Sequence, residues 1–171
     1  CSSDLETLTP DGWLRTGDKG HMDREGYLSI TGRVKDMFKT SKGKYIAPAP
    51  IEDKLVTHSS IEACAVTGAN FAQPFALVML SPDAIDLSKT SEGRNTLEKA
   101  LEVHLHDVNQ QLEPHEKLDF LAAVTTTWTA ENGMVTPTLK VKRPCIETAY
   151  GPSFERWSHM KKGVVWADST A

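Results

Sequence analysis

The chain has 171 residues, of which 39% are apolar and 25% charged, and its formal net charge is −4. A chain of this length forms one domain, or one domain with a small appendage, and the composition is ordinary for a soluble globular protein. No run of about 18 apolar residues occurs, so the sequence predicts no transmembrane segment. Cys1, Cys64 and Cys145 lie far apart and form no CxxC pair, which favours a reducing compartment such as the cytoplasm over a disulfide framework or a zinc site.

Basic residues are concentrated in one short segment. Five of them lie within Arg33–Lys44 beside a single carboxylate, Asp36, although the chain as a whole is acidic. This contrast argues against a general nucleic-acid-binding protein and favours one local site for an anion such as phosphate. Composition alone leaves a second interpretation open, a solvated edge hairpin whose lysines discourage strand pairing.

The first part of the chain is predicted to form turns and short strands, followed by a helix. Thr16–Asp18 has the character of a tight loop that presents a carboxylate. A hairpin closed near Lys42-Gly43 is expected over residues 33–46, because glycine suits a turn position that requires a positive φ. Pro50 is well placed at the first position of a helix, since the missing N–H of proline costs nothing there.

The middle of the chain has the pattern of buried strands and an amphipathic helix. Residues 61–66 and 75–80 are short apolar runs that are typical of a buried hairpin. A long helix is predicted from Ser91 to a stop at Glu113-Pro114. Its apolar residues recur at spacings of three and four: Leu97, Leu101, Leu105, Val108 and Leu112.

The C-terminal part is predicted to contain a strand, an exposed loop and a helix. The strand covers residues 120–127 and the loop 129–138, and the helix starts at Pro144 and is interrupted at Gly151-Pro152. We therefore predict an α+β fold. The chain is expected to divide into a β segment, a main domain and a frayed tail: residues 1–33, 34–160 and 161–171.

Two places near the β segment are candidates for nucleotide contacts and for a hinge. The Asp18 carboxylate could accept two hydrogen bonds from the vicinal hydroxyls of a ribose, although aspartate after glycine is also common in plain turns. Arg33 follows a glycine that allows close approach of a ligand, and its guanidinium group suits hydroxyls or phosphate; an edge-strand arginine is the alternative. Lys35 and Asp36 lie where the β segment meets the main domain, which is where a hinge would lie.

A further candidate lies on the loop before the C-terminal helix. A single lysine there, Lys140, would neutralise negative charge that develops on a carboxylate or phosphate oxygen. The three cations of Lys140–Arg143 would equally suit a solvated helix start. The histidines form no HExxH motif and no metal-like cluster in the sequence, so no metal site is predicted on this chain.

The order of these motifs resembles that of the adenylate-forming enzymes, which include acyl-CoA synthetases, luciferases and nonribosomal peptide adenylation domains. The resemblance rests on Asp11–Asp18, Gly32–Asp36 and Thr136–Lys140, and it extends from Asp11 to about Tyr150. Within the family, the segments around Lys39 and Lys140 look most like the long-chain fatty acid CoA ligases. The resemblance implies a small mobile lid domain, with a short β-hairpin and a three-stranded sheet flanked by helices, after the last β segment of a large N-terminal domain.

The resemblance also implies a role for each matching residue. Asp18 and Arg33 would contact the ribose and nucleotide of ATP, and Lys35 with Asp36 would form the hinge of the lid. Lys140 would enter the site only for adenylation. After rotation of the lid, a hairpin face that serves thioester formation would replace it: Lys39, Lys42, Gly43 and Lys44.

The family uses ATP with Mg²⁺, a carboxylic acid and, in these relatives, CoA. Its phosphate loop, magnesium ligand and acyl pocket lie in the N-terminal domain, which would be the partner of this lid. We therefore expect the C-terminal part of a long-chain fatty acid–CoA ligase that is inactive by itself, in the cytoplasm, with peripheral membrane association of the intact enzyme left open.

Two other functions stay open at this stage. One is a ligase that delivers acyl or amino-acyl groups to a carrier protein, and the other is a detached, non-catalytic lid that acts as an interaction module. The sequence also departs from the family pattern, because Leu139 replaces the usual glycine before the late lysine and Lys35 stands where other members have aspartate. Flexibility of the Lys140 loop is therefore expected to come from Gly133.

Overall fold

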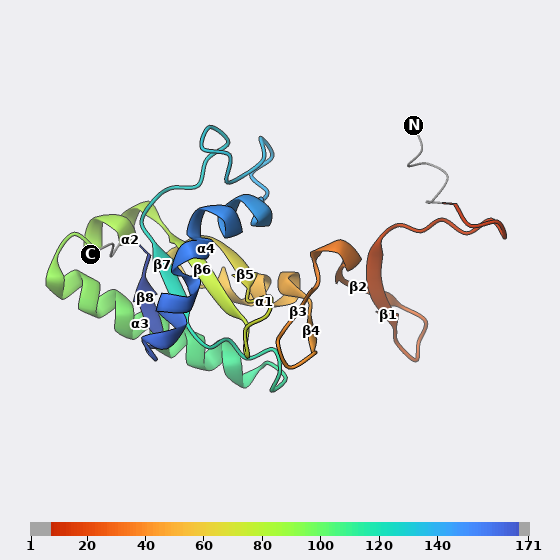
Figure 1. Ribbon diagram of the computed structural model, residues 1–171, viewed down its shortest axis with the longest axis horizontal. Coiled ribbons are helices and arrows are strands. Elements are labelled where there is room, and N and C mark those ends of the chain that lie inside the picture. The colour runs from red at the N-terminus through yellow and green to blue at the C-terminus, as the bar shows by residue number, and fades with distance from the viewer. Residues whose placement is uncertain (1–7, 168–171) are drawn as a thin grey trace.

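The computed structural model describes residues 8–167, so Cys1 lies outside the described part of the chain. Figure 1 shows a main domain in which helices cover both faces of a sheet, with an N-terminal β-hairpin that projects to one side. This combination of separate sheets and helices confirms the predicted α+β class.

The N-terminal hairpin is formed by β1 (Asp18–Met22) and β2 (Leu28–Arg33), which pair in antiparallel fashion. The turn between them is closed by Asp23, whose Oδ1 accepts the N–H groups of residues 25 and 27 at 2.9 Å. Large apolar side chains of this segment, such as Trp13, are exposed. The segment therefore contributes little to the core of the main domain.

The main domain follows the 3₁₀ turn η1 (Val34–Asp36). Next come the short hairpin of β3 (Phe38–Lys39) and β4 (Tyr45–Ile46) and the helix α1 (Pro48–Leu55). The predicted helix is confirmed, and the predicted hairpin is confirmed over residues 38–46, whereas residues 34–36 of the predicted range form the 3₁₀ turn. The helix begins two residues earlier than expected, because a proline in the first turn lacks an N–H group that has no partner there in any case.

The main sheet has four strands in the order β5-β6-β7-β8. Its first two strands, β5 (Ile61–Thr67) and β6 (Phe75–Leu80), form the predicted antiparallel hairpin. The strands β7 (Leu121–Val124) and β8 (Val164–Trp166) add in parallel. Helices make both parallel connections, as such crossovers require: α2 (Pro82–Leu87), α3 (Ser91–Gln110) and α4 (Arg143–His159).

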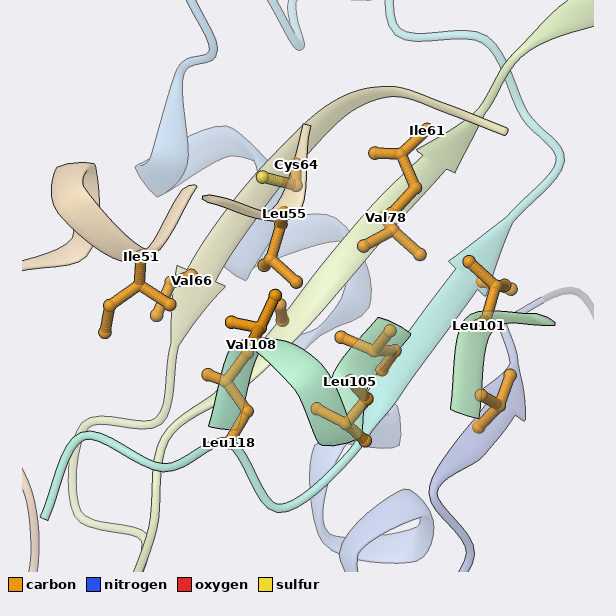
Figure 2. Packing of buried hydrophobic residues seen from close by; sticks show 14 of the residues in the cluster. Ile51, Leu55, Ile61, Cys64, Val66, Val78, Leu101, Leu105, Val108 and Leu118 are labelled. Atoms are coloured by element: carbon orange, nitrogen blue, oxygen red, sulfur yellow. The ribbon is translucent and has the colours of Figure 1, made fainter. Parts of the chain in front are cut away.

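Both faces of this sheet are buried, which explains why its strands are continuous apolar runs. On one face, side chains of α1 and α3 meet those of β5 and β6, and Figure 2 shows Leu55, Leu105 and Val108 pointing into this cluster. On the other face, α4 packs through Phe154 and Trp157. This packing fixes α1 and the start of α4, which flank the candidate site, relative to the sheet. No helix in the described part of the chain is long and apolar enough to span a bilayer.

The prediction that Gly151-Pro152 interrupts the C-terminal helix is wrong. Helix α4 runs through both residues without a break. Ile146 lies before the proline and Phe154 and Trp157 after it, and all three are buried against the same face of the sheet. Burial of these side chains offsets the hydrogen bond that the missing N–H of Pro152 removes.

The tail predicted to fray from residue 161 instead contains β8, and the expected three-stranded sheet therefore has four strands. Trp166 secures this strand, since its Nε1 donates a hydrogen bond to Glu98 Oε1 at 2.5 Å. The guanidinium carbon of Arg94 lies 4.0 Å from the centroid of the Trp166 ring. Residues 168–171 lie outside the described part of the chain.

Candidate functional site

A cleft of about 740 Å³ lies where the N-terminal hairpin, α1, β5 and the segment that enters α4 meet. Charged residues from distant parts of the sequence line it: Asp18, Arg33, Asp36, Glu52, Lys140, Lys142 and Arg143. The structure thus brings together both residues predicted to contact a nucleotide, one predicted hinge residue and the predicted catalytic lysine.

Asp18 and Arg33 are neighbours across the N-terminal hairpin. The strand register places them opposite each other, and Arg33 Nε lies 3.7 Å from Asp18 Oδ1. The side chains of Arg33 and Asp18 are 74% and 34% exposed, so this pair contributes little to stability. Gly32 before the arginine has a φ of 145°, a conformation that residues with a Cβ rarely adopt. Both charged groups therefore remain available to a ligand in the cleft.

Lys140 lies at the end of a tight turn. The Leu139 N–H donates to the Thr136 carbonyl at 2.8 Å, and the Thr136 N–H donates to the Lys140 carbonyl at 2.8 Å. Leu139 has a φ of 60°, as the third residue of such a three-residue hairpin turn requires. The Lys140 side chain is exposed, and its ammonium group forms no hydrogen bond or ion pair with the described residues. It is free to meet an anionic group of a ligand.

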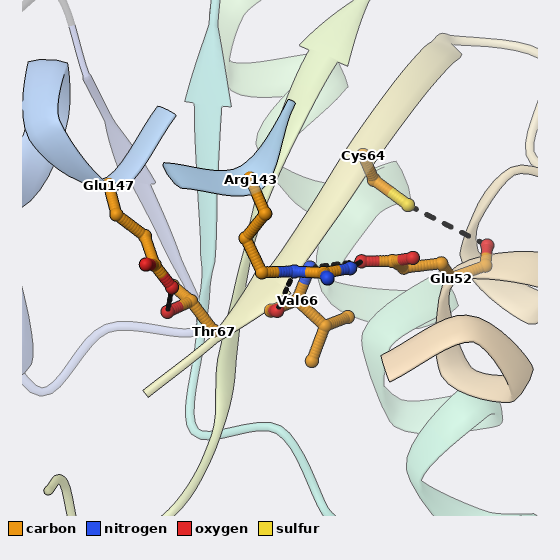
Figure 3. Close-up of polar contacts among 6 residues, drawn as sticks. All are labelled: Glu52, Cys64, Val66, Thr67, Arg143 and Glu147. Atoms are coloured by element: carbon orange, nitrogen blue, oxygen red, sulfur yellow. Dashed lines mark hydrogen bonds and ion pairs between the residues drawn. The ribbon is translucent and has the colours of Figure 1, made fainter. Parts of the chain in front are cut away.

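A second pair of charged residues lines the cleft and was not predicted as part of the site. Arg143 Nη2 donates to Glu52 Oε1 at 2.5 Å, and both side chains are about four-fifths buried, with exposures of 19% and 20% (Figure 3). Next to them, Cys64 Sγ donates to the Glu52 carbonyl at 3.6 Å. Burial, reinforced by the Glu52 carboxylate, raises the pKa of the Cys64 thiol. Cys64 is therefore a protonated core residue and not a nucleophile.

The hairpin lysines predicted to serve thioester formation do not line this cleft. Lys42 Nζ donates to Gln73 Oε1 at 3.3 Å, and Lys39 Nζ lies 5.8 Å from the centroid of the Tyr45 ring. Gly43 has a φ of 79° in the turn that joins β3 and β4, as predicted for this position. Lys44 is exposed in the same turn. These residues form a surface separate from the one that carries Lys140.

One of the two predicted hinge residues, Asp36, lines the cleft. Both belong to η1, a single 3₁₀ turn between the N-terminal hairpin and the main domain. Both side chains are exposed, and Asp36 lines the cleft whereas Lys35 does not. A short turn of this kind is a suitable place for a change in φ and ψ, but their hinge role stays a prediction.

Comparison with known sequences gives this arrangement a context. The model of one protein family, the AMP-binding enzyme C-terminal domain, matches residues 35–157. The chain belongs to this family. The match covers α1, the main sheet up to β7, and most of α4, and it includes Lys140.

Several known proteins are similar to this chain over most of its length. It is 31% identical over 159 residues to long-chain-fatty-acid–CoA ligase FadD15 of Mycobacterium tuberculosis, which covers 85% of this chain and 26% of the ligase. It is 34% identical over 153 residues to the peroxisomal long chain acyl-CoA synthetase 6 of Arabidopsis thaliana, covering 81% of this chain and 22% of that protein. The chain thus spans about a quarter of the length of these relatives.

The fold also matches solved structures. The adenylation domain of a carboxylate reductase from Mycobacterium chelonae superposes with a TM-score of 0.80 at 22% identity, covering 92% of this chain and 25% of that one. The structural match covers more of the chain than the family model, which spans residues 35–157. It supports the assignment of the fold.

The positive φ of Leu139 leads to a stability prediction. At most positions glycine is less stabilising than alanine, but a residue with a φ of 60° reverses this order, because a Cβ there is strained. We expect Leu139→Gly to be more stable than Leu139→Ala by about 1 kcal/mol. Both variants lose the same exposed side chain, so urea unfolding of the two isolates the backbone effect. A Leu139→Ala variant as stable as Leu139→Gly would show that the turn relaxes out of the left-handed conformation.

The residues of this chain do not fit the Mg²⁺ ion that the family implies. Within residues 8–167, no group of three or more His, Cys, Asp or Glu side chains is arranged to hold a metal ion. Asp18 and Asp36 line the cleft, but cations from Arg33 and Lys140 share it. We therefore assign no step of the chemistry below to a metal held by this chain.

Proposed function

We propose that this chain is the C-terminal part of an ATP-dependent acyl-CoA synthetase that activates a long-chain fatty acid and transfers the acyl group to CoA. The observation that carries the proposal is the single cleft that collects Asp18, Arg33 and Lys140 from opposite ends of the chain. Similarity to two long-chain acyl-CoA ligases at 31% and 34% identity supports the choice of substrate class.

In the first half-reaction, a carboxylate oxygen of the fatty acid attacks the α-phosphorus of ATP, and pyrophosphate leaves. We assign the ribose hydroxyls to the Asp18 carboxylate, which accepts two hydrogen bonds, and the nucleotide phosphate or hydroxyls to Arg33. The ammonium group of Lys140 would lie between the carboxylate and the α-phosphate and reduce the repulsion between these two anions. The chain supplies binding, orientation and positive charge to this step.

In the second half-reaction, the sulfur of CoA attacks the acyl carbonyl carbon and AMP leaves. We propose that a rotation at η1 withdraws the Lys140 turn and presents the face of Lys39, Lys42, Gly43 and Lys44 in its place. This face lies apart from the cleft that contains Lys140. The domain would therefore have to move between the two half-reactions to bring first Lys140 and then this face to the same substrate, which supports two alternating arrangements.

The proposed partners are the fatty acid, ATP, CoA and an N-terminal domain of the same protein. Mg²⁺ would be held mainly by that domain. A cytoplasmic location stays a prediction, since the name of one relative places that protein in the peroxisome. Transfer to the phosphopantetheine arm of a carrier protein is a variant of the same chemistry, and the acceptor preference of the intact enzyme distinguishes the two.

ATP–pyrophosphate exchange tests the proposal. A full-length protein that carries this chain is expected to catalyse exchange that depends on a long-chain fatty acid and to form acyl-CoA when CoA is added. The 171-residue chain alone is expected to give no exchange above background, because Asp18, Arg33 and Lys140 line only one wall of a nucleotide site. Robust exchange by the chain alone, or none by the full-length protein with any fatty acid, would contradict the proposal.

A further inference from the structure

Arg143 connects three elements around the cleft. It is the first residue of α4 and lies three positions after Lys140. Its Nε donates to the Val66 carbonyl of β5 at 3.1 Å, and its Nη2 donates to Glu52 Oε1 of α1 at 2.5 Å. The same Glu52 oxygen accepts the Val66 N–H at 2.8 Å. Figure 3 shows the two side chains meeting beside Val66, so that one strand residue, one arginine and one glutamate form a closed set of hydrogen bonds.

One role of this set is to cover the edge of the sheet. β5 is an edge strand, and the N–H and C=O groups of Val66 find their partners in Glu52 and Arg143. Neutral side chains could satisfy the same two groups. Two opposite charges that are about four-fifths buried carry a desolvation penalty that edge capping alone does not require. Their position in the cleft suggests a second role.

Apolar packing holds the base of the Lys140 turn, since Val135 is buried and Met134 and Val141 pack against the same core cluster. The turn is closed by backbone hydrogen bonds within residues 134–142, including one from the Lys142 N–H to the Met134 carbonyl at 2.8 Å. The Lys140 side chain is exposed. After the turn, the first side chain that forms hydrogen bonds to both β5 and α1 is that of Arg143. Core packing therefore holds the turn to the sheet, and the Glu52–Arg143 pair sets its position relative to α1 and the cleft.

We propose that Glu52 and Arg143 are positioning residues for Lys140, which hold its turn at the cleft during adenylation. Glu52 belongs to the helix that follows the hinge and the hairpin, whereas Arg143 belongs to the segment that follows Lys140. The pair thus fixes Lys140 relative to the chain segment that carries the hinge. This inference rests on the proposed function. A displacement of about 1 Å in a reacting group is enough to cost up to two orders of magnitude in rate.

The test compares mild variants in a full-length protein that carries this chain. Arg143→Lys keeps the charge but loses the forked contact to Val66 and Glu52, and Glu52→Gln keeps the shape but loses the charge. Each is expected to lower kcat of the adenylation step about tenfold, with KM for ATP and fatty acid changed less than about twofold. Thioester formation from preformed acyl-adenylate should keep its rate. The double variant should adenylate no more slowly than the slower of the two single variants, because the two residues act through one contact.

Glu147→Gln provides a matched control. Glu147 lies one turn further along α4, and its Oε1 accepts a hydrogen bond from Thr67 Oγ1 of β5 at 2.5 Å (Figure 3). Like Arg143, Glu147 connects α4 to β5, but it does not line the cleft. Glu147→Gln should leave adenylation unchanged. If it slowed adenylation as much as Glu52→Gln does, a general loosening of α4 would explain both effects, and the positioning role would be wrong.

Hydrogen exchange of this chain separates the inference from the proposed function. The backbone amides of Leu139, Lys140 and Lys142, which donate hydrogen bonds within the turn, are expected to exchange about tenfold faster in Arg143→Lys and Glu52→Gln but not in Glu147→Gln. Unchanged exchange in the first two variants would overturn the positioning role even if the protein adenylates fatty acids. If exchange became faster in these variants but the full-length protein did not adenylate fatty acids, Glu52 and Arg143 would still position the Lys140 turn, and the proposed function would be wrong.

Discussion

Replacing Lys140 with alanine in a full-length protein is expected to slow fatty acid adenylation by about two orders of magnitude. Lys140 lines the cleft with an exposed side chain, and its ammonium group has no partner among the described residues, so its charge is available for the carboxylate and the α-phosphate. Loss of one such electrostatic group raises the barrier by roughly 3 kcal/mol. Single-turnover formation of acyl-adenylate, with ATP and fatty acid saturating, measures this step directly.

The same variant should form the thioester from preformed acyl-adenylate at nearly the normal rate, because the proposed face for that step does not include Lys140. Lys99→Ala is a suitable control, since this exposed lysine lies on α3, away from the cleft. Lys99→Ala should leave both half-reactions unchanged. If Lys140→Ala slowed both half-reactions equally, the alternation of two surfaces would be wrong, and Lys140 would have a general role in binding or folding.

The sequence alone supports the identity of the candidate site residues better than their arrangement. Asp18, Arg33 and Lys140 stand in motifs whose order is specific, and the structure brings them into one cleft. Glu52 and Arg143 lie outside these motifs, and their ion pair joins positions separated by 91 residues. No local spacing reveals such a contact, because it depends on how α1 and α4 pack on the sheet. In the sequence, nothing distinguishes Arg143 from the neighbouring basic residues Lys140 and Lys142.

The fold shows a similar division between local and tertiary effects. The helical period of α3 predicts a buried stripe, and its leucines are all in the core. Strand β8 has only three residues, and its stability comes from pairing with β7 and from the contacts of Trp166 with α3. In α4, the local signal of Gly151-Pro152 favours a break, but the buried side chains on either side keep the helix continuous. Both errors arise where tertiary packing overrides a short local signal.

The core that holds α1 against the sheet makes a second large effect testable. Leu101 lies on α3 with none of its surface exposed, in the cluster that also contains Leu55 of α1 (Figure 2). Leu101→Ala removes buried methyl groups and leaves a cavity, so it is expected to lower the free energy of unfolding by about 3 kcal/mol. Urea unfolding followed by far-UV circular dichroism measures this change, at an unchanged slope with denaturant.

Val103→Ala is the matched control, since Val103 lies on the same helix two residues later and is 62% exposed. Its effect should stay within about 0.5 kcal/mol, as for most surface substitutions. The comparison separates core packing from helix propensity, because alanine favours the helix in both variants. Equal losses for the two variants would mean that α3 does not pack on the sheet through the face that carries Leu101. The helix α1, and with it Glu52, would then lack the fixed position that the proposed placement of Lys140 requires.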